Sequence, residues 1–123
     1  MSIRSTAVQW VKSSRGIDCG VMCASKFYGP EESWTNKAAW AFEVDKSVLE
    51  KSPLQMVYLL CEKAPGIRDF HCLQLPGSYL IENKKELYIR SNNRYSMFLS
   101  AEQENLYQDE RGEGKVTFGQ FLI

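Results

Sequence analysis

The segment 38–45, AAWAFEVD, constrains the fold more than any other part of the chain. Trp40, Phe42 and Val44 occupy alternate positions in it, and small or acidic residues lie between them. Side chains of a β-strand point alternately to its two faces, so this period of two predicts a strand with one face in the core and the other in water. The fold therefore contains a sheet.

Further strands are predicted where short apolar runs lie between turn residues. Residues 5–12, STAVQWVK, carry apolar side chains on both faces of an extended chain. This favours a core strand buried inside a sheet, and a short helix is the alternative. The other predicted strands comprise residues 19–27, 56–61, 69–76, 86–91 and 95–100.

The segment 53–63 is compatible with two structures. Ser52 as an N-cap and Pro53 in the first turn describe a helix, whereas the apolar run MVYLLC at 56–61 describes a central strand. We prefer the strand, because of a resemblance described below.

Helical structure is predicted at two other places. KSVLEK, residues 46–51, forms a short connection or a helical turn, and Ser100 with Gln103 is a capping box that opens a helix through about residue 108. The apolar end of the chain, VTFGQFLI, is expected to dock on the core. A chain of 123 residues has the length of one domain. We therefore predict a single compact α/β domain over residues 1–123, with mixed α+β as the alternative and a central sheet of about five strands with two or three helices.

Charge and composition narrow the choice of partner and compartment. The net charge is zero at pH 7, which argues against attraction of the whole chain to nucleic acid or an anionic membrane, although Arg4, Lys12 and Arg15 form a basic stretch without an acid. No apolar run reaches the roughly 20 residues of a membrane span, and no signal-peptide pattern is present. We predict a cytoplasmic protein whose four cysteines are free and mostly buried.

The cysteines and the single histidine are the candidate metal ligands. Cys19 and Cys23 have an acceptable spacing for zinc, with Cys61 further along the chain. His71 and Cys72, however, are neighbours on a predicted strand and point to opposite faces, so both cannot easily reach one ion. We therefore predict structural thiols, a structural histidine and no bound metal.

Acidic residues and a lysine form the best candidate set for catalysis. Asp18, Glu43, Asp45 and Lys46 are the residue types that a Mg²⁺-dependent nuclease needs, since carboxylates hold the ion and a lysine activates or orients water. Glu43 and Asp45 lie two apart on a strand, so their carboxylates face the same side.

This set resembles the motif of the PD-(D/E)xK endonuclease superfamily, which includes restriction enzymes and resolvases. Two registers compete. In the first, Asp18 is the early acid and Glu43 with Lys46 is the later pair, with one residue too many between them. In the second, Gln9 and Lys12 represent a Gln-x-Lys strand, again with one residue too many.

The second register covers more of the chain, about residues 6 to 80. The later segments WAFEV, MVYLLC and FHCLQLP then resemble the downstream strands of family members, which is the reason for preferring a strand at 56–61. In this register the first family acid would lie before Met1. The resemblance therefore implies a nuclease-like fold with an incomplete motif.

These observations support three hypotheses about function. The first is a non-catalytic or degenerate nuclease-like domain that binds nucleic acid or a nucleic-acid-processing or defence protein. The second is an inhibitor or immunity-type protein-binding module of unrelated fold, and the third is an active Mg²⁺-dependent nuclease. The predicted phosphate- or partner-binding residues are Gln9, Lys12, Arg15 and Trp34, and the low-ranked catalytic set is Asp18, Glu43, Asp45 and Lys46.

Exposed aromatic residues bear on the choice among these hypotheses, because Trp and Tyr are good interface anchors. Trp34, which is flanked by polar residues, is expected to be exposed, whereas Trp10 and Trp40 are expected in the core. Tyr28, next to a Gly-Pro turn, is a further candidate. We expect no cofactor unless the nuclease hypothesis holds, no membrane partner, and we allow for a homodimer.

Overall fold

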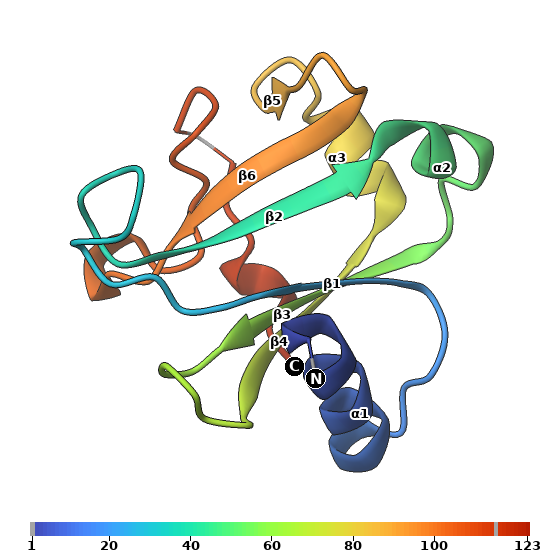
Figure 1. Cartoon of the computed structure of the whole chain (residues 1–123). Coiled ribbons are helices and arrows are strands. Elements are labelled where there is room, and N and C mark those ends of the chain that lie inside the picture. Colours follow the sequence, from blue (N-terminus) through green and yellow to red (C-terminus); the bar gives the residue numbers. More distant parts are fainter. Residues whose placement is uncertain (1, 115) are drawn as a thin grey trace.

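Six strands in this computed structural model are divided between two three-stranded sheets (Figure 1). The structure describes residues 2–114 and 116–123. The strands are β1 (Val21–Ser25), β2 (Ala39–Asp45), β3 (Met56–Glu62), β4 (Phe70–Pro76), β5 (Tyr88–Ile89) and β6 (Arg94–Ser100). The helices are α1 (Ile3–Arg15), α2 (Lys46–Lys51) and α3 (Gly77–Glu82), with 3₁₀ turns η1 (Gln103–Asn105) and η2 (Gly119–Phe121).

The first sheet has the order β1-β3-β4. β1 is parallel to β3, with Cys23 opposite Leu59, and β4 is antiparallel to β3, with Leu73 opposite Leu59. β3 is therefore central and buried on both faces, which explains its unbroken apolar run. The predicted strand at 56–61 is confirmed, and the helical alternative for 53–63 is wrong.

The second sheet has the order β2-β6-β5 and is antiparallel throughout. Its inner face carries Trp40 and Phe42 from β2 and Tyr95 and Met97 from β6, all of which are buried in the main core. The residues between them face outward. The alternation at 38–45 thus predicts both the strand and its buried face correctly.

The two sheets separate between β1 and β2. Just beyond β1, Tyr28 and Ala39 exchange two backbone hydrogen bonds of 3.0 Å. Along β1 itself, the contacts to β2 are made by side chains. The Ser25 hydroxyl accepts a hydrogen bond from the Ala41 N–H at 2.9 Å, and the Cys23 thiol lies 3.5 Å from the Glu43 carbonyl oxygen. The prediction of one central sheet of about five strands is therefore wrong, because these side chains hold the strands too far apart for a continuous ladder.

The segment 5–12 is part of helix α1, so the prediction of a core strand there is also wrong. The Ser2 hydroxyl caps the helix by accepting from the Ser5 N–H at 3.1 Å, and Gly16 ends it in the left-handed conformation at φ 68°. Ala7 and Val11, one turn apart, are fully buried against the first sheet. Helix α1 contacts β1 and β4 (Figure 1).

The main core lies between the two sheets, and a smaller one lies between α1 and the first sheet. The end of the chain closes the main core, as predicted: Val116 and Phe118 are buried, and the Ile123 N–H donates to the Cys72 carbonyl oxygen at 3.0 Å. The capping-box helix after Ser100 is wrong. Ser100 belongs to β6, and η1 is only a single 3₁₀ turn.

Candidate functional site

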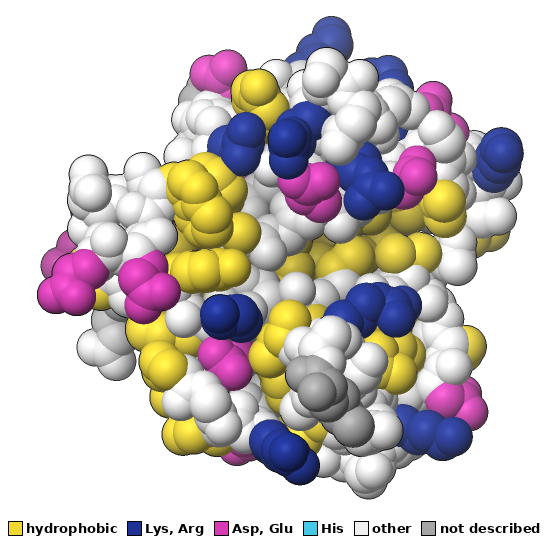
Figure 2. Space-filling model, viewed as in Figure 1, with side chains coloured by type: hydrophobic (Ala, Val, Ile, Leu, Met, Phe, Trp, Pro, Cys, Tyr) yellow, Lys and Arg dark blue, Asp and Glu magenta, His cyan; other side chains and the backbone are white. Residues whose placement is uncertain are grey.

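The outward face of the second sheet carries a cluster of aromatic and arginine side chains. They come from the loop before β2, from β5 and β6, and from the loop after η1, and they surround a hollow of about 290 Å³. Figure 2 shows hydrophobic side chains gathered beside the β2–β6 strands, with basic side chains next to them. We call this surface the aromatic–arginine face; it comprises Tyr28, Trp34, Glu43, Tyr88, Arg90, Phe98 and Arg111.

Trp34 is the most exposed member of this face. Its ring stacks on that of Phe98, with centroids 4.7 Å apart and planes inclined by 13°. Tyr28 meets the same indole edge-on at 4.9 Å. Phe98 is thereby covered to 9% exposure, whereas Trp34 keeps 56% of its surface in solvent. The indole is held in place by protein on one side and is open on the other.

Arg111 packs between two rings of the same face. Its guanidinium carbon lies 4.3 Å from the ring centroid of Tyr88 and 4.7 Å from that of Phe98, which is cation–π geometry. Contacts within the chain therefore hold the exposed aromatic surface and the cation in a fixed arrangement.

The position of Arg111 is set by Asp109, a fully buried carboxylate. One carboxylate oxygen accepts from the N–H groups of Phe98 at 3.0 Å and Arg111 at 3.1 Å, and the other accepts from Gly112 at 3.1 Å. Burial raises the pKa of Asp109, and the three backbone hydrogen bonds oppose that shift. The chain after β6 is thus fixed to the strand beneath Trp34.

The residues predicted for catalysis have other contacts. Glu43 forms an ion pair with Arg90 on the aromatic–arginine face. Asp45 caps α2, accepting from the Ser47 N–H at 2.8 Å, and Lys46 pairs with Glu50 at 3.4 Å. Glu43 and Asp45 do share the outward face of β2, as expected.

Asp18, the fourth member of that set, is exposed in the loop between α1 and β1. Within the two described stretches of chain, no three His, Cys, Asp or Glu side chains gather where they could hold a metal ion.

The residues predicted for partner binding are split between two places. Gln9, Lys12 and Arg15 are exposed on α1, where the Arg15 guanidinium lies 5.4 Å from the ring centroid of Trp10. Trp34 lies on the second sheet instead, and its predicted exposure is confirmed. Gln9 and Lys12 lie on helix α1 and not on the strand that was predicted for residues 5–12.

The four cysteines are free, as predicted. Cys19 is exposed and Cys23 half-buried, while Cys61 and Cys72 are buried. Burial raises the pKa of Cys23 and of Cys72 to about 11, and it also raises the pKa of Cys61 well above its ordinary value. These three are therefore thiols at neutral pH.

His71 and Cys72 face opposite sides of β4. The His71 ring lies edge-on to Trp40 at 5.9 Å and to Tyr107 at 5.8 Å, whereas Cys72 packs in the core beneath α1. Burial lowers the pKa of His71.

Sequence reasoning finds Trp34 and Tyr28 but misses Phe98, Tyr88 and Arg111. In the sequence, Phe98 has the pattern of an ordinary strand residue. No feature of the residues around Arg111 predicts that its side chain packs on Phe98. None of the helices in the described part of the chain has the length and apolar character of a membrane span. The chain matches no protein-family model, and comparison with curated proteins and with solved structures gives no significant match either.

Proposed function

We propose that this protein is a non-catalytic binding module that recognises another protein through its aromatic–arginine face. The observation that carries the proposal is the Trp34 indole, which is supported from below by Phe98 and is 56% exposed. Trp, Tyr and Arg are the residue types that dominate binding energy at protein interfaces, and this face combines all three.

Preorganisation supports the proposal. Ordering a flexible side chain at an interface costs roughly 0.5–1.5 kcal/mol. Trp34 is already stacked, Arg111 is already held between two rings, and the Asp109 hydrogen bonds fix the loop that bears it. A partner that covers this face therefore meets side chains that have lost much of their freedom.

Charge favours a protein over a nucleic acid as the partner. The chain has no net charge, and Arg90 on this face is neutralised by Glu43. Nucleic-acid binding draws much of its affinity from unneutralised basic side chains. Among proteins, we propose a partner that processes nucleic acid or acts in defence, as the resemblance to the endonuclease superfamily implies.

A second candidate is single-stranded nucleic acid. An exposed indole on a sheet is the kind of platform on which unpaired bases stack. An active nuclease has weaker support, because Glu43, Asp45 and Lys46 each have another role on the surface.

The test is affinity capture from lysate of the source cells with the intact protein, Trp34→Ala and Leu54→Ala. Leu54 is the matched control, since it is 88% exposed and lies outside the aromatic–arginine face. A captured protein is identified by mass spectrometry, purified, and its Kd measured with each variant. We expect Trp34→Ala to raise Kd by more than about tenfold, as for a binding hot spot, and Leu54→Ala to leave it unchanged.

Equal binding by all three proteins would contradict the proposal. A gel shift with single-stranded oligonucleotides at low salt distinguishes nucleic-acid binding from protein binding. Binding that weakens with salt and is lost in Trp34→Ala would show that the face takes nucleic acid instead. Size-exclusion chromatography checks whether the partner is a second copy of this chain.

A further inference from the structure

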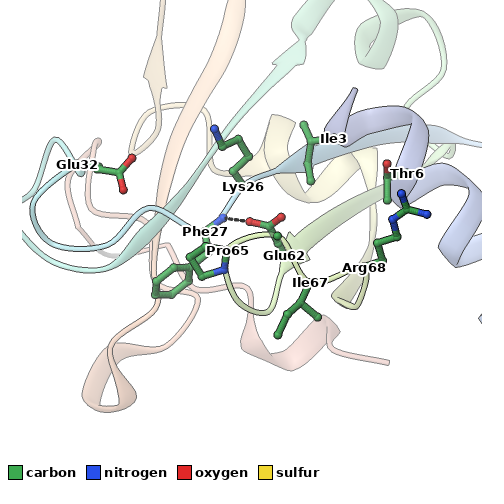
Figure 3. Close-up of a pocket in the computed structure, with 10 residues that line it drawn as sticks. Ile3, Thr6, Lys26, Phe27, Glu32, Glu62, Pro65, Ile67 and Arg68 are labelled. Carbon is green, nitrogen blue, oxygen red and sulfur yellow. Dashed lines mark hydrogen bonds between the residues drawn. The ribbon is translucent and has the colours of Figure 1, made fainter. Parts of the chain in front are cut away.

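A second hollow, of about 590 Å³, shares no lining residue with the aromatic–arginine face and lies at the carboxyl ends of the parallel strands β1 and β3. The first turns of α1 and the loop between β3 and β4 form its walls (Figure 3). Its size is within the range of about 300–1,000 Å³ that is typical of small-molecule sites.

Glu62, the last residue of β3, is a buried carboxylate that borders this hollow. The residue is 5% exposed, and one carboxylate oxygen accepts from the Phe27 N–H at 3.0 Å (Figure 3). The backbone carbonyl of Glu62 accepts from the Trp40 indole N–H at 2.8 Å, so the residue is held firmly.

The second carboxylate oxygen of Glu62 has no hydrogen-bond partner or ion pair among the residues that the structure describes. It is also not among the buried polar atoms that are sealed from solvent. Water in the hollow therefore reaches this oxygen, and the donor group of a ligand can replace that water. The hollow is where such a donor can enter.

Two cationic side chains border the same hollow. Lys26 and Arg68 lie on different sides of Glu62 in Figure 3, with Arg68 next to Thr6. Both are exposed, and in the described part of the chain neither is within ion-pair distance of a carboxylate. Part of the wall is apolar and is formed by Ile3, Pro65 and Ile67.

From this arrangement we infer that the hollow binds a small zwitterion of the amino-acid class, with its ammonium group at Glu62 and its carboxylate at Arg68 and Lys26. The lining carries charges of both signs, with Glu62 and the exposed Glu32 against Lys26 and Arg68, so a ligand with a single charge meets groups that repel it. A molecule with an ammonium and a carboxylate group can pair with the acidic and the basic side chains at once. The apolar wall then contacts a hydrocarbon side chain, so we expect amino acids such as leucine to bind best.

The test uses the full chain, labelled with ¹⁵N, and follows backbone amide signals by NMR. L-leucine, leucinamide and N-acetyl-leucine are titrated separately, because the second lacks the carboxylate and the third lacks the ammonium group. We expect L-leucine to shift the Phe27 and Ile67 signals in a saturable way. Each derivative is expected to bind at least about tenfold more weakly, the equivalent of 1.4 kcal/mol.

Variants test which side chains bind the charged groups of the amino acid. Glu62→Gln keeps an acceptor for the Phe27 N–H but removes the negative charge, and it is expected to abolish binding of L-leucine. Glu32→Gln is the matched control, since Glu32 borders the same hollow but is exposed and is expected to tolerate the change. Arg68→Ala, at an exposed position, provides a second variant that does not depend on how the core tolerates Glu62→Gln.

Three outcomes would overturn the inference. They are no saturable shift with L-leucine, equal binding of L-leucine and its two derivatives, and equal binding of L-leucine by the Glu62→Gln and Glu32→Gln proteins. The inference is independent of the proposed partner face. Trp34→Ala is expected to leave leucine binding unchanged.

Discussion

Asp109 shows how one buried side chain can position an entire surface. Its three hydrogen bonds join the N–H group of Phe98, on β6, to those of Arg111 and Gly112. Because all three partners are backbone donors, the side chain must offer acceptors only, which an ionised carboxylate does and an amide does not.

Asp109→Asn is therefore expected to lower the free energy of unfolding by about 1–3 kcal/mol, since the new amide group turns a donor toward buried donors. Chemical denaturation followed by circular dichroism measures the change. Glu113→Gln, an exposed substitution in the same loop, is the control and is expected to have little effect. Equal stability of the two variants would show that Asp109 does not anchor the loop.

His71 provides a pH-dependent prediction, and as the single histidine it can be followed alone. Burial lowers the pKa of its imidazole below the ordinary 6.5. The unfolded chain therefore takes up a proton at a higher pH than the folded one does. Its stabilising contribution is present above pH 6.5 and is lost as the pH falls through the lowered pKa.

An NMR titration of the His71 imidazole signals is expected to give a midpoint below 6.5 in the folded protein. In parallel, denaturation at a series of pH values should show stability rising with pH across that window. The slope of the free energy of unfolding against pH should decrease in His71→Gln. A midpoint at or above the ordinary value would contradict the burial of this ring.

At the scale of elements, the strands were predictable and helix α1 was not. Alternation at 38–45 is a period signal that tertiary packing only reinforces, whereas the unbroken run at 56–61 also fits a helix and is assigned to a strand through the family resemblance. In residues 5–12, Ala7 and Val11 are buried one turn apart, but the neighbouring Trp10 also fits an extended chain. The deciding signals lie outside the apolar segment.

Those signals are the caps. Ser2 at the N-cap and Gly16 after the last turn, with Lys12 and Arg15 near the end, are the features that mark a helix. The opposite error occurs at Ser100, where a good capping-box pattern is overridden because the residue is fully buried in β6. Caps are informative only when the residue is free to leave a strand.

Gly77 tests the packing between α2 and α3. A Cβ atom at this position would lie 2.9 Å from the Leu49 Cδ2 atom and 3.2 Å from the Gln55 carbonyl oxygen. Gly77→Ala is therefore expected to destabilise the protein by about 1–3 kcal/mol through overpacking. Thermal unfolding measures the loss. Gly29→Ala is the control, because a Cβ there meets nothing within 4 Å, and equal melting temperatures would contradict the packing.

At the scale of the whole molecule, sequence reasoning could predict one exposed indole but not the surface around it. Trp34 is surrounded by polar neighbours in sequence, and that is a local signal. Its stacking on Phe98 joins residues more than 60 positions apart, and Arg111 reaches Phe98 from a later loop. Such contacts depend on how the sheets and loops assemble. For the same reason the division into two sheets could not be read from strand patterns alone.

The thiols report on the integrity of the whole molecule. In the native protein we expect N-ethylmaleimide to modify the exposed Cys19 first, and Cys61 and Cys72 only when the core opens. Mass spectrometry of peptides at successive times measures the order. In denaturant all four should react together. Rapid modification of Cys61 in the native protein would contradict the burial of β3.

The uneven burial of the three tryptophans has a practical consequence. Trp40 is shielded in the core and Trp10 is partly covered, whereas Trp34 faces water. Iodide or acrylamide should therefore quench the emission of one fluorophore in preference to the others. Any molecule that settles on that indole should shift its spectrum to the blue, so the chain carries a native optical probe for finding what binds it.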